Sequence, residues 1–181
     1  MKIVVLIFCL ITSSYAFSIN DSLLKIHATL VPKVYLMDYN FENKLENKTI
    51  NIAILYEKSE YKAAKSLKEK IESRYPKGIN SYKIVSKLLL YTQMLSSDVN
   101  IIYMLPSSKD MILKAVQQAK ENNILTFSYD KNDLNYGVMI SLNIAKKIKP
   151  ILNLKAIKLN NIEMRPILIK ISQIFTYSLK I

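Results

Sequence analysis

The stretch TINIAILY at Thr49–Tyr56 decides the fold class. It is short, rich in β-branched residues and almost entirely apolar, which is typical of a strand buried on both faces of a sheet. DVNIIYML at residues 98–105 and ILTFSY at residues 124–129 repeat this pattern, and residues 82–90 form a further expected strand. We therefore expect a sheet in which these strands lie mostly parallel to one another.

Amphipathic segments occupy the gaps between these strands. Residues 59–75 place apolar side chains at helical spacing on one face and charged side chains on the other, and Pro76 stops the pattern. A second such segment begins after Pro106 and ends at residues 122–123. Strands that alternate with helices predict a single Rossmann-like, three-layer α/β domain, with helices on both faces of a mostly parallel sheet.

The C-terminal third shows a different pattern. Residues 137–145 alternate between apolar and polar side chains, and residues 148–154 follow as a second apolar run. We expect a β-hairpin at the sheet edge, because Pro150 fits only an edge strand or a bulge. Two helices are expected after it, a short one at residues 155–160 and another that Pro166 opens and whose apolar face extends to Phe175.

The first sixteen residues have the pattern of a secretory signal peptide. Lys2 supplies the positive charge, residues 3–11 are apolar, and small residues precede a cleavage site after Ala16. The apolar run is too short for a membrane-spanning helix, which needs about twenty residues. We therefore expect export to the periplasm, and the only cysteine, Cys9, leaves with the signal peptide.

Two further parts are expected after the signal peptide. Residues 17–48 should form an N-terminal helix and loop packed on the domain, with a kink or an end at Pro32. Residues 49–181 should form the α/β domain itself.

Composition excludes several kinds of function. One histidine, two glycines and a mature chain without cysteine leave no recognisable set of metal ligands, no phosphate-binding loop and no catalytic set, so we expect no cofactor, no metal and no enzymatic activity. The net charge of +12 comes from lysines scattered along the chain rather than clustered. Together with export, this scatter argues against a nucleic-acid partner.

A candidate partner-binding loop follows the expected strand at residues 124–129. Ligands of open α/β sheets bind beyond the carboxyl ends of such strands. Tyr129 and Tyr136 could pack on a partner there, and Asp130 and Asp133 could accept hydrogen bonds. The alternative is a structural loop in which the two carboxylates stabilise turns and Gly137 allows an unusual backbone angle.

Several motifs in the C-terminal third resemble the YfiR-like (HmsC-like) family of periplasmic proteins. LTFS at residues 125–128 is followed by GVMISL at 137–142, LNLKA at 152–156, NI at 161–162 and PILIKIS at 166–172. In that family a glycine-led strand pairs with an "INL" strand, and a short helix and a leucine-rich final helix follow. The aromatic segment that the family carries earlier in the chain, and its cysteines, are missing here.

The resemblance implies a Rossmann-like periplasmic regulator that works by protein–protein binding. Its partner would be the periplasmic domain of a membrane-bound sensor, either a diguanylate cyclase or a kinase, and a homodimer is left open. LNLKAIK at residues 152–158 also resembles a motif of ABC-transporter substrate-binding proteins. The alternative function is therefore a small-ligand-binding module related to one lobe of such a protein.

Overall fold

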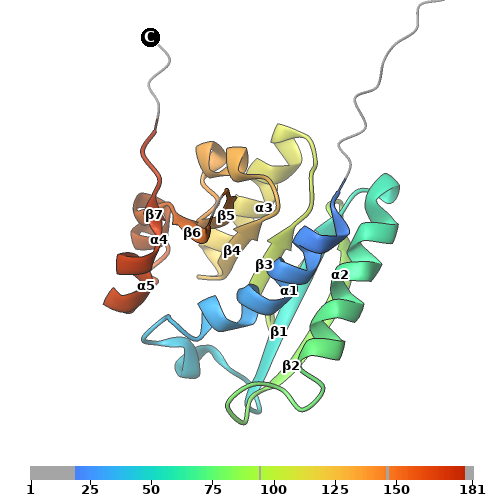
Figure 1. Ribbon diagram of the computed structural model, residues 1–181, viewed down its shortest axis with the longest axis horizontal. Coiled ribbons are helices and arrows are strands. Elements are labelled where there is room, and N and C mark those ends of the chain that lie inside the picture. Colours follow the sequence, from blue (N-terminus) through green and yellow to red (C-terminus); the bar gives the residue numbers. More distant parts are fainter. Residues whose placement is uncertain (1–18, 94, 146, 178–181) are drawn as a thin grey trace, which may run out of the picture.

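A seven-stranded sheet forms the centre of the computed structural model, which describes residues 19–177 apart from residues 94 and 146 (Figure 1). The strand order is β2-β1-β3-β4-β5-β6-β7, and every neighbouring pair is parallel except β5 and β6, which form an antiparallel hairpin. The α/β fold predicted from the sequence is confirmed. The strands are β1 (Thr49–Tyr56), β2 (Lys83–Leu90), β3 (Ile101–Met104), β4 (Leu125–Ser128), β5 (Ile140–Ile144), β6 (Ile148–Leu152) and β7 (Gln173–Ile174).

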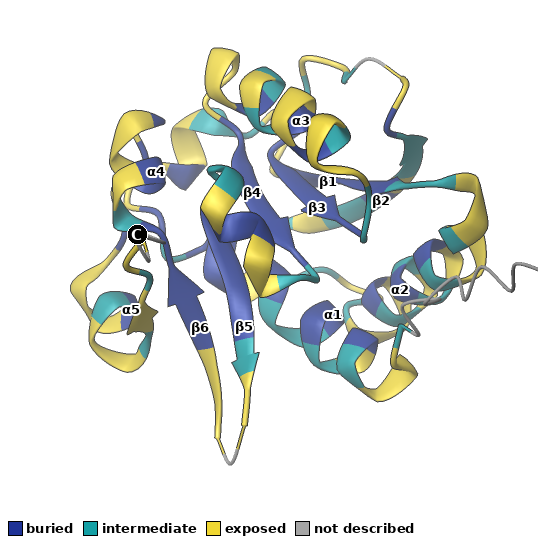
Figure 2. Cartoon of the chain, turned by 90° about the horizontal axis from the view of Figure 1, so that it is seen from above, coloured by how far each residue is buried: buried dark blue, intermediate teal, exposed yellow. Residues whose placement is uncertain are grey.

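Helices cover both faces of this sheet. Seen from above, α1 and α2 lie on one side of the strands and α3 lies on the other, and the strands between them are the most deeply buried part (Figure 2). Helices α4 and α5 lie at the β6–β7 edge (Figure 1). The helices are α1 (Asp21–Tyr35), α2 (Tyr61–Arg74), α3 (Lys109–Glu121), α4 (Leu154–Leu159) and α5 (Pro166–Ile171), with 3-10 turns η1 (Phe41–Lys44), η2 (Lys58–Glu60) and η3 (Lys131–Tyr136).

Helix α1 continues past Pro32, where the sequence predicted a kink or an end. Its start is capped by Asn20, whose side-chain oxygen accepts from the backbone N–H of Ser22 at 2.8 Å. Pro32 removes one backbone hydrogen bond, yet the helix extends to Tyr35 because Val31 and Tyr35 are buried in the core on either side of the proline. Burial of these apolar side chains outweighs the lost bond.

The last helix is shorter than the sequence predicted. Pro166 opens α5 as expected, but the helix ends at Ile171. Residues Gln173–Ile174 then pair in parallel with Ile151 and Leu152 as β7. The backbone N–H of Phe175 donates to the carbonyl of Leu152 at 2.8 Å, so Phe175 continues the sheet and does not share a helical face. Hydrogen bonds to β6 replace those that a longer helix would make.

Pro150 lies within β6, which is not the outermost strand. On one side it is paired with Leu142 of β5. On the other side β7 pairs only with residues 151 and 152, so no neighbouring strand requires the N–H that proline lacks. The short β7 therefore makes this proline compatible with an inner strand.

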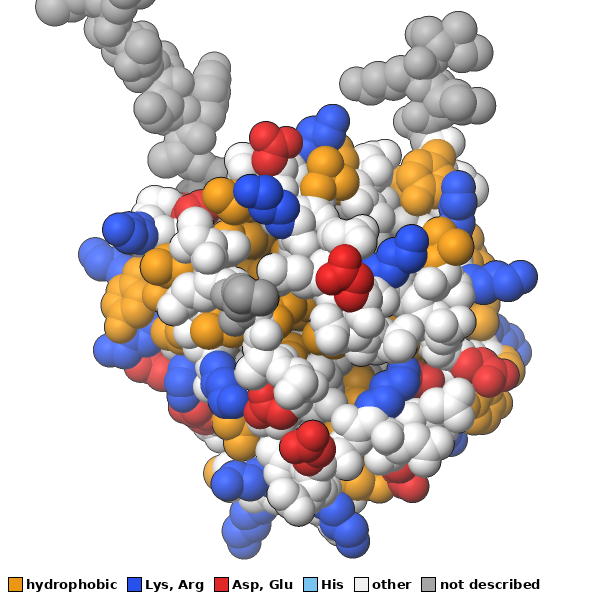
Figure 3. All heavy atoms as spheres, turned by 180° about the vertical axis from the view of Figure 1, so that it is seen from behind, with side chains coloured by type: hydrophobic (Ala, Val, Ile, Leu, Met, Phe, Trp, Pro, Cys, Tyr) orange, Lys and Arg blue, Asp and Glu red, His pale blue; other side chains and the backbone are white. Residues whose placement is uncertain are grey.

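The expected signal peptide, residues 1–16, lies outside the described residues. Among the residues that the structure describes, no helix is long and apolar enough to cross a membrane. On the face covered by α3, lysine and arginine side chains lie interspersed with carboxylates (Figure 3).

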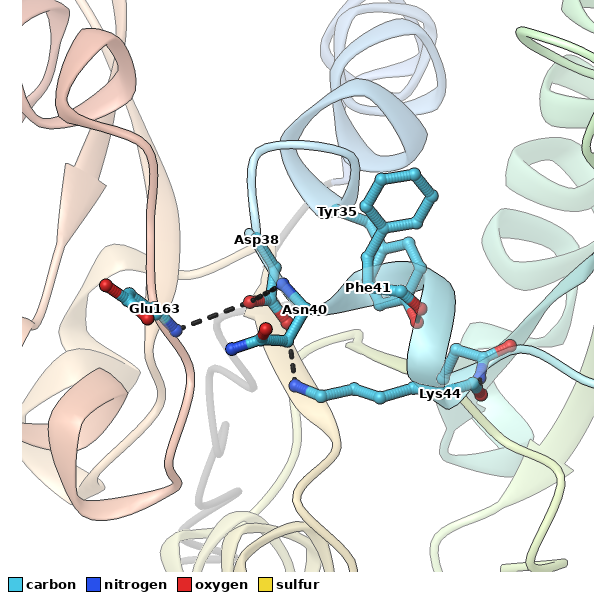
Figure 4. A network of polar contacts seen from close by, with 7 residues as sticks. Tyr35, Asp38, Asn40, Phe41, Lys44 and Glu163 are labelled. Atoms are coloured by element: carbon cyan, nitrogen blue, oxygen red, sulfur yellow. Dashed lines mark hydrogen bonds and ion pairs between the residues drawn. The ribbon is translucent and has the colours of Figure 1, made fainter.

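A buried carboxylate joins the N-terminal segment to the C-terminal one (Figure 4). Asp38 is 2% exposed, and its side chain accepts from Lys44 Nζ at 2.7 Å, from the Asn40 N–H at 3.1 Å and from the Glu163 N–H at 3.3 Å. Asp38 also forms an isolated antiparallel bridge with Met164. One side chain thus fixes the loop after α1 to the segment between α4 and α5.

Candidate functional site at the carboxyl edge of the sheet

The strand order places a topological switch point between β1 and β3. From β1 the chain passes to β2 on one side of it, and β3 lies on the other side. Open α/β sheets bind their ligands beyond the carboxyl ends of strands at such a point. Here Glu57 directly follows β1, and Ser107 lies three residues beyond the end of β3. Ser107 Oγ donates to Glu57 Oε1 at 2.6 Å, so this hydrogen bond joins the two strand ends.

A buried tyrosine lies next to these groups. Tyr91 directly follows β2, and its hydroxyl donates to the carbonyl of Leu105 at 2.5 Å. Burial raises the pKa of Tyr91 well above its usual value, and the nearby charges of Asp133 and Glu57 raise it further. The carboxyl ends of β1, β2 and β3 therefore share one electrostatic environment with the loop after β4.

That loop is held by hydrogen bonds to the end of β4. Ser128, the last residue of β4, donates from Oγ to Asp133 Oδ2 at 2.5 Å and accepts from the Asp130 N–H at 3.1 Å. Asp133 is 6% exposed. Burial raises its pKa to about 6; the Ser128 hydrogen bond works against this rise, and the charge of Asp130 adds to it. Asp133 thus holds the loop from inside rather than facing solvent.

Asp130 and Gly137 define the two ends of η3. Asp130 is its N-cap, and its Oδ1 accepts from the Asn132 N–H at 2.9 Å. Gly137 closes the turn with a φ of 98°, in the left-handed region that favours glycine. Asp130 and Gly137 thus have the roles expected of a structural loop, in which a carboxylate stabilises a turn and glycine allows an unusual backbone angle. These roles leave Asp130 partly exposed beside the partly exposed rings of Tyr129 and Tyr136.

Tyr129 connects the loop to α1. Its hydroxyl accepts from the Asn20 N–H at 2.9 Å, and its ring stacks on His27 with the centroids 5.4 Å apart. His27 is buried, and its Nδ1 lies 2.9 Å from the hydroxyl of Tyr103. Burial lowers the pKa of His27 to about 4, so the ring is neutral at physiological pH. The neutral ring of His27 can accept a hydrogen bond from the Tyr103 hydroxyl at Nδ1 while it stacks on Tyr129.

Tyr136 lies at the other end of the loop. It packs against the apolar cluster beneath α3, whereas Tyr129 packs against the larger cluster beneath α1. Lys109, the first residue of α3, places its Nζ 5.7 Å from the centre of the Tyr136 ring. The loop therefore straddles the edge of the sheet, with one tyrosine toward each helical layer.

The four residues singled out in the sequence thus occupy one loop, but they are placed differently. Asp130 and Asp133 lie close together, whereas Tyr129 and Tyr136 pack on different clusters. Sequence reasoning missed the other side chains of this edge. Glu57 and Tyr91 carried a usable signal, since each directly follows an expected strand; the other missed residues are Ser107, His27 and Tyr103.

No side chains in the described part of the chain form a recognisable metal site. Groups of three or more His, Cys, Asp or Glu side chains that could hold an ion are absent from the described residues. An open hollow of about 530 Å³ lies near the opposite end of the sheet, where Phe41, Glu42, Tyr82 and Arg165 are among its lining residues.

Two solved structures share this fold. A conserved domain protein from Vibrio cholerae O1 biovar El Tor superposes with a TM-score of 0.61 at 15% identity, covering 84% of this chain and 60% of that one. The ABC domain from Streptococcus pneumonia in complex with L-Trp gives a TM-score of 0.55 at 11% identity, with the same coverage. This chain thus spans 60% of the length of either structure.

Comparison of the sequence with protein families identifies one family, whereas comparison with curated proteins identifies no relative. A family profile described as YfiR/HmsC-like matches residues 39–173, which is well over half of the sequence. The matched segment contains strands β1 to β6, the first residue of β7 and the loop at residues 129–136; Asn20 and His27, which contact this loop, precede the segment.

Proposed function

The chain belongs to the YfiR/HmsC-like family of periplasmic regulators, and on that premise we propose that it binds the periplasmic domain of a membrane-bound diguanylate cyclase or sensor kinase. We place the contact at the carboxyl edge of the sheet, on the loop at residues 129–136. The role is regulatory: this protein changes the output of its partner and performs no chemistry of its own.

The observation that carries this proposal is a loop that internal hydrogen bonds hold in place and that has partly exposed polar and aromatic side chains. Ser128, Asp130 and Asp133 hold it with internal hydrogen bonds, and Tyr129 is fixed by Asn20 and His27. A preorganised loop loses little conformational entropy when it binds. Tyrosine rings bury large areas at small entropic cost, which makes them frequent anchors of protein interfaces.

The switch point itself supports a surface contact rather than an enclosed ligand. The Ser107–Glu57 hydrogen bond joins the ends of β1 and β3, and the Tyr91 hydroxyl is bonded to the Leu105 carbonyl. These contacts occupy the Ser107 hydroxyl, one carboxylate oxygen of Glu57 and the Tyr91 hydroxyl, so fewer polar atoms are available to a small molecule in the crevice. What the edge offers is its outer side, with Asp130 and the two partly exposed tyrosines.

The proposal is tested by titrating purified periplasmic cyclase and kinase domains from the same genome with the mature chain. Tyr136→Ala should weaken binding by a factor of about 30 or more, as the loss of an interface anchor does. Tyr39→Ala is the matched control, because Tyr39 is about half exposed and lies near the opposite end of the sheet. The control should bind like the wild type.

Asp130→Ala separates a contact residue from a turn residue. A residue that only caps η3 should lower the unfolding free energy by roughly 0.5–2 kcal/mol and leave the binding of the folded fraction unchanged. A contact residue should weaken binding at temperatures where the variant is fully folded. If Tyr136→Ala and Asp130→Ala both melt earlier but bind with wild-type affinity, the loop is scaffolding and the proposed site is wrong.

The small-ligand alternative makes a different prediction. A ligand would enter the hollow lined by Phe41, Tyr82 and Arg165, which is remote from the loop at residues 129–136. Calorimetric titration with a panel of amino acids and small anions would then show saturable binding. That binding should be lost in Tyr82→Ala and kept in Tyr136→Ala.

A further inference from the structure

Net positive charge is highest in the C-terminal part of the described chain, because carboxylates are scarce there. Residues 138–177 contain seven lysines and arginines and a single carboxylate, Glu163. Residues 19–137 contain seventeen cations and thirteen anions over a stretch three times as long. None of the ion pairs found among the described residues involves a cation of the C-terminal part. Within the part of the chain that the structure describes, no carboxylate therefore neutralises these cations.

Exposed apolar side chains are concentrated in the same part. Ten large apolar or aromatic side chains are exposed among the described residues, and seven of them lie beyond residue 138. Single exposed apolar residues need no explanation, but a group of them marks an interaction surface. The seven are Ile144, Ile148, Leu159, Ile167, Ile171, Ile174 and Tyr177.

The strand register brings three of these isoleucines onto one face of the sheet. Ile144 of β5 is paired with Ile148 of β6, and Leu152 of β6 is paired with Ile174 of β7. Because side chains alternate along a strand, positions 148 and 152 share a face, and so do their partners. The ends of β5 and β6 nearest the turn project beyond the body of the protein and are exposed, whereas their other ends are buried (Figure 2).

Helix α5 continues this surface beside the hairpin. Leu168 packs into the same core cluster as Leu152, which places α5 on the face that carries the three isoleucines. Ile167 and Ile171 are four residues apart, so they share the side of α5 that remains exposed. We use the name hairpin–α5 surface for the exposed side chains of Ile144, Ile148, Ile167, Ile171 and Ile174 together with the exposed Lys147, Lys149 and Lys170. Lys149 lies beside Ile148 at the exposed end of β6 but on the other face of the strand, so this end of the hairpin carries positive charge on the side away from the isoleucines.

We propose that the hairpin–α5 surface binds the protein to an anionic phospholipid bilayer. Protein interfaces are enriched in tyrosine, tryptophan and arginine and depleted in lysine, whereas this surface consists of isoleucine and lysine. Lysine ammonium groups are attracted to anionic headgroups, and branched aliphatic side chains can enter the boundary with the acyl chains. A second copy of the chain would bring like charges together, so self-association through this surface is disfavoured.

This inference is independent of the proposed partner site. The loop at residues 129–136 and the hairpin–α5 surface are built from different residues. Binding to the bilayer would keep an exported regulator at the membrane in which its partner is embedded.

The test is co-sedimentation of the mature chain with vesicles, in the absence of any partner protein. Vesicles of phosphatidylethanolamine and phosphatidylglycerol should bind the protein at low salt, and vesicles of phosphatidylcholine should bind it far less. Reversing Lys147 and Lys149 to glutamate should lower the partition coefficient about 30-fold or more, since each lysine near an anionic surface contributes about a factor of five. Lys114→Glu/Lys120→Glu on α3 makes the same change of net charge on another face and should have a much smaller effect.

Ile144→Ser/Ile148→Ser tests the apolar contribution, because its binding should fall even though its charge is unchanged. Thermal melts of each variant show whether it is folded at the assay temperature. The proposal is overturned if wild-type protein binds neither kind of vesicle, or both equally well. It is also overturned if the hairpin variants and the α3 control lose binding to the same extent. If the hairpin variants bind lipid normally but no longer bind a periplasmic protein partner, this surface is a protein-binding site instead.

Discussion

His27 lies on α1 and contacts the candidate loop, and its replacement by glutamine should make the unfolding free energy much less dependent on pH in the acidic range. In the unfolded chain the imidazole takes up a proton below about pH 6.5, whereas burial lowers the pKa of His27 to about 4 in the folded protein. Between these values only the unfolded state binds the proton, so the unfolding free energy falls as the pH falls. Over the window from pH 7.5 to pH 5 this difference amounts to about 2 kcal/mol.

The assay is urea unfolding of wild type and His27→Gln at pH 7.5 and pH 5. The variant loses the stack on Tyr129 and should be less stable at pH 7.5, but the gap should shrink or reverse by about 2 kcal/mol at pH 5. Tyr103→Phe is the control, because it removes the hydroxyl next to His27 Nδ1 and retains the titrating ring. If wild type and His27→Gln lose stability in parallel on acidification, His27 is not the buried neutral base described here.

Three further changes test other parts of the structure. Burial raises the pKa of Asp133 to about 6, so the wild type should lose stability as the pH rises from about 4 to about 6 and this carboxyl ionises in the folded state. Asp133→Asn cannot ionise and should avoid that loss, which makes it about 1–2 kcal/mol more stable than the wild type above pH 6 in urea titrations. No gain in stability would contradict the buried placement of Asp133. Asp38→Ala should lower the unfolding free energy by about 3 kcal/mol in denaturant titrations, because two backbone N–H groups and Lys44 lose their acceptor. Asp38→Asn keeps an acceptor oxygen and should lower it less. Equal losses in the two variants would refute this role for the carboxylate. Gly137→Ala should lower the unfolding free energy by about 1–2 kcal/mol in the same assay, since φ is 98° at this position and the new Cβ would lie 3.1 Å from a methyl carbon of Val116. If the variant is as stable as the wild type, the turn can relax and this strain is absent.

The central strands could be predicted from sequence because their pattern depends on local chemistry. An apolar, β-branched run such as residues 49–56 has few stable alternatives to a strand buried on both faces. The mostly parallel arrangement of the strands followed from the crossovers that alternating helices impose. The family resemblance rested on the same C-terminal motifs that the family profile covers.

The errors arose where tertiary contacts override local preference. Pro32 is a helix breaker in isolation, but the buried side chains around it keep α1 intact. The segment after Ile171 has the periodicity of a helix, yet the free edge of β6 offers it hydrogen bonds as β7. Neither the core around α1 nor the open edge of β6 is visible in the local sequence.

The candidate loop could be placed from sequence, but its internal organisation could not. Its position follows from the rule that sites lie beyond the carboxyl ends of strands. The burial of Asp133, and the stack of Tyr129 on His27, depend on residues about one hundred positions apart or on the local path of the chain. Likewise the pairing of Glu57 with Ser107 requires β1 and β3 to be neighbours, which only the sheet order reveals.

The most direct test of partner binding at the carboxyl edge is amide hydrogen exchange of the mature chain, alone and with a saturating amount of the periplasmic cyclase or kinase domain that binds it. Exchange should slow at the backbone amides of residues 129–138 when the partner is added. It should not change in residues 76–82, at the opposite end of the sheet between α2 and β2. Protection of residues 76–82 with unchanged exchange in residues 129–138 would contradict the account, because the partner would then bind at the wrong end of the domain.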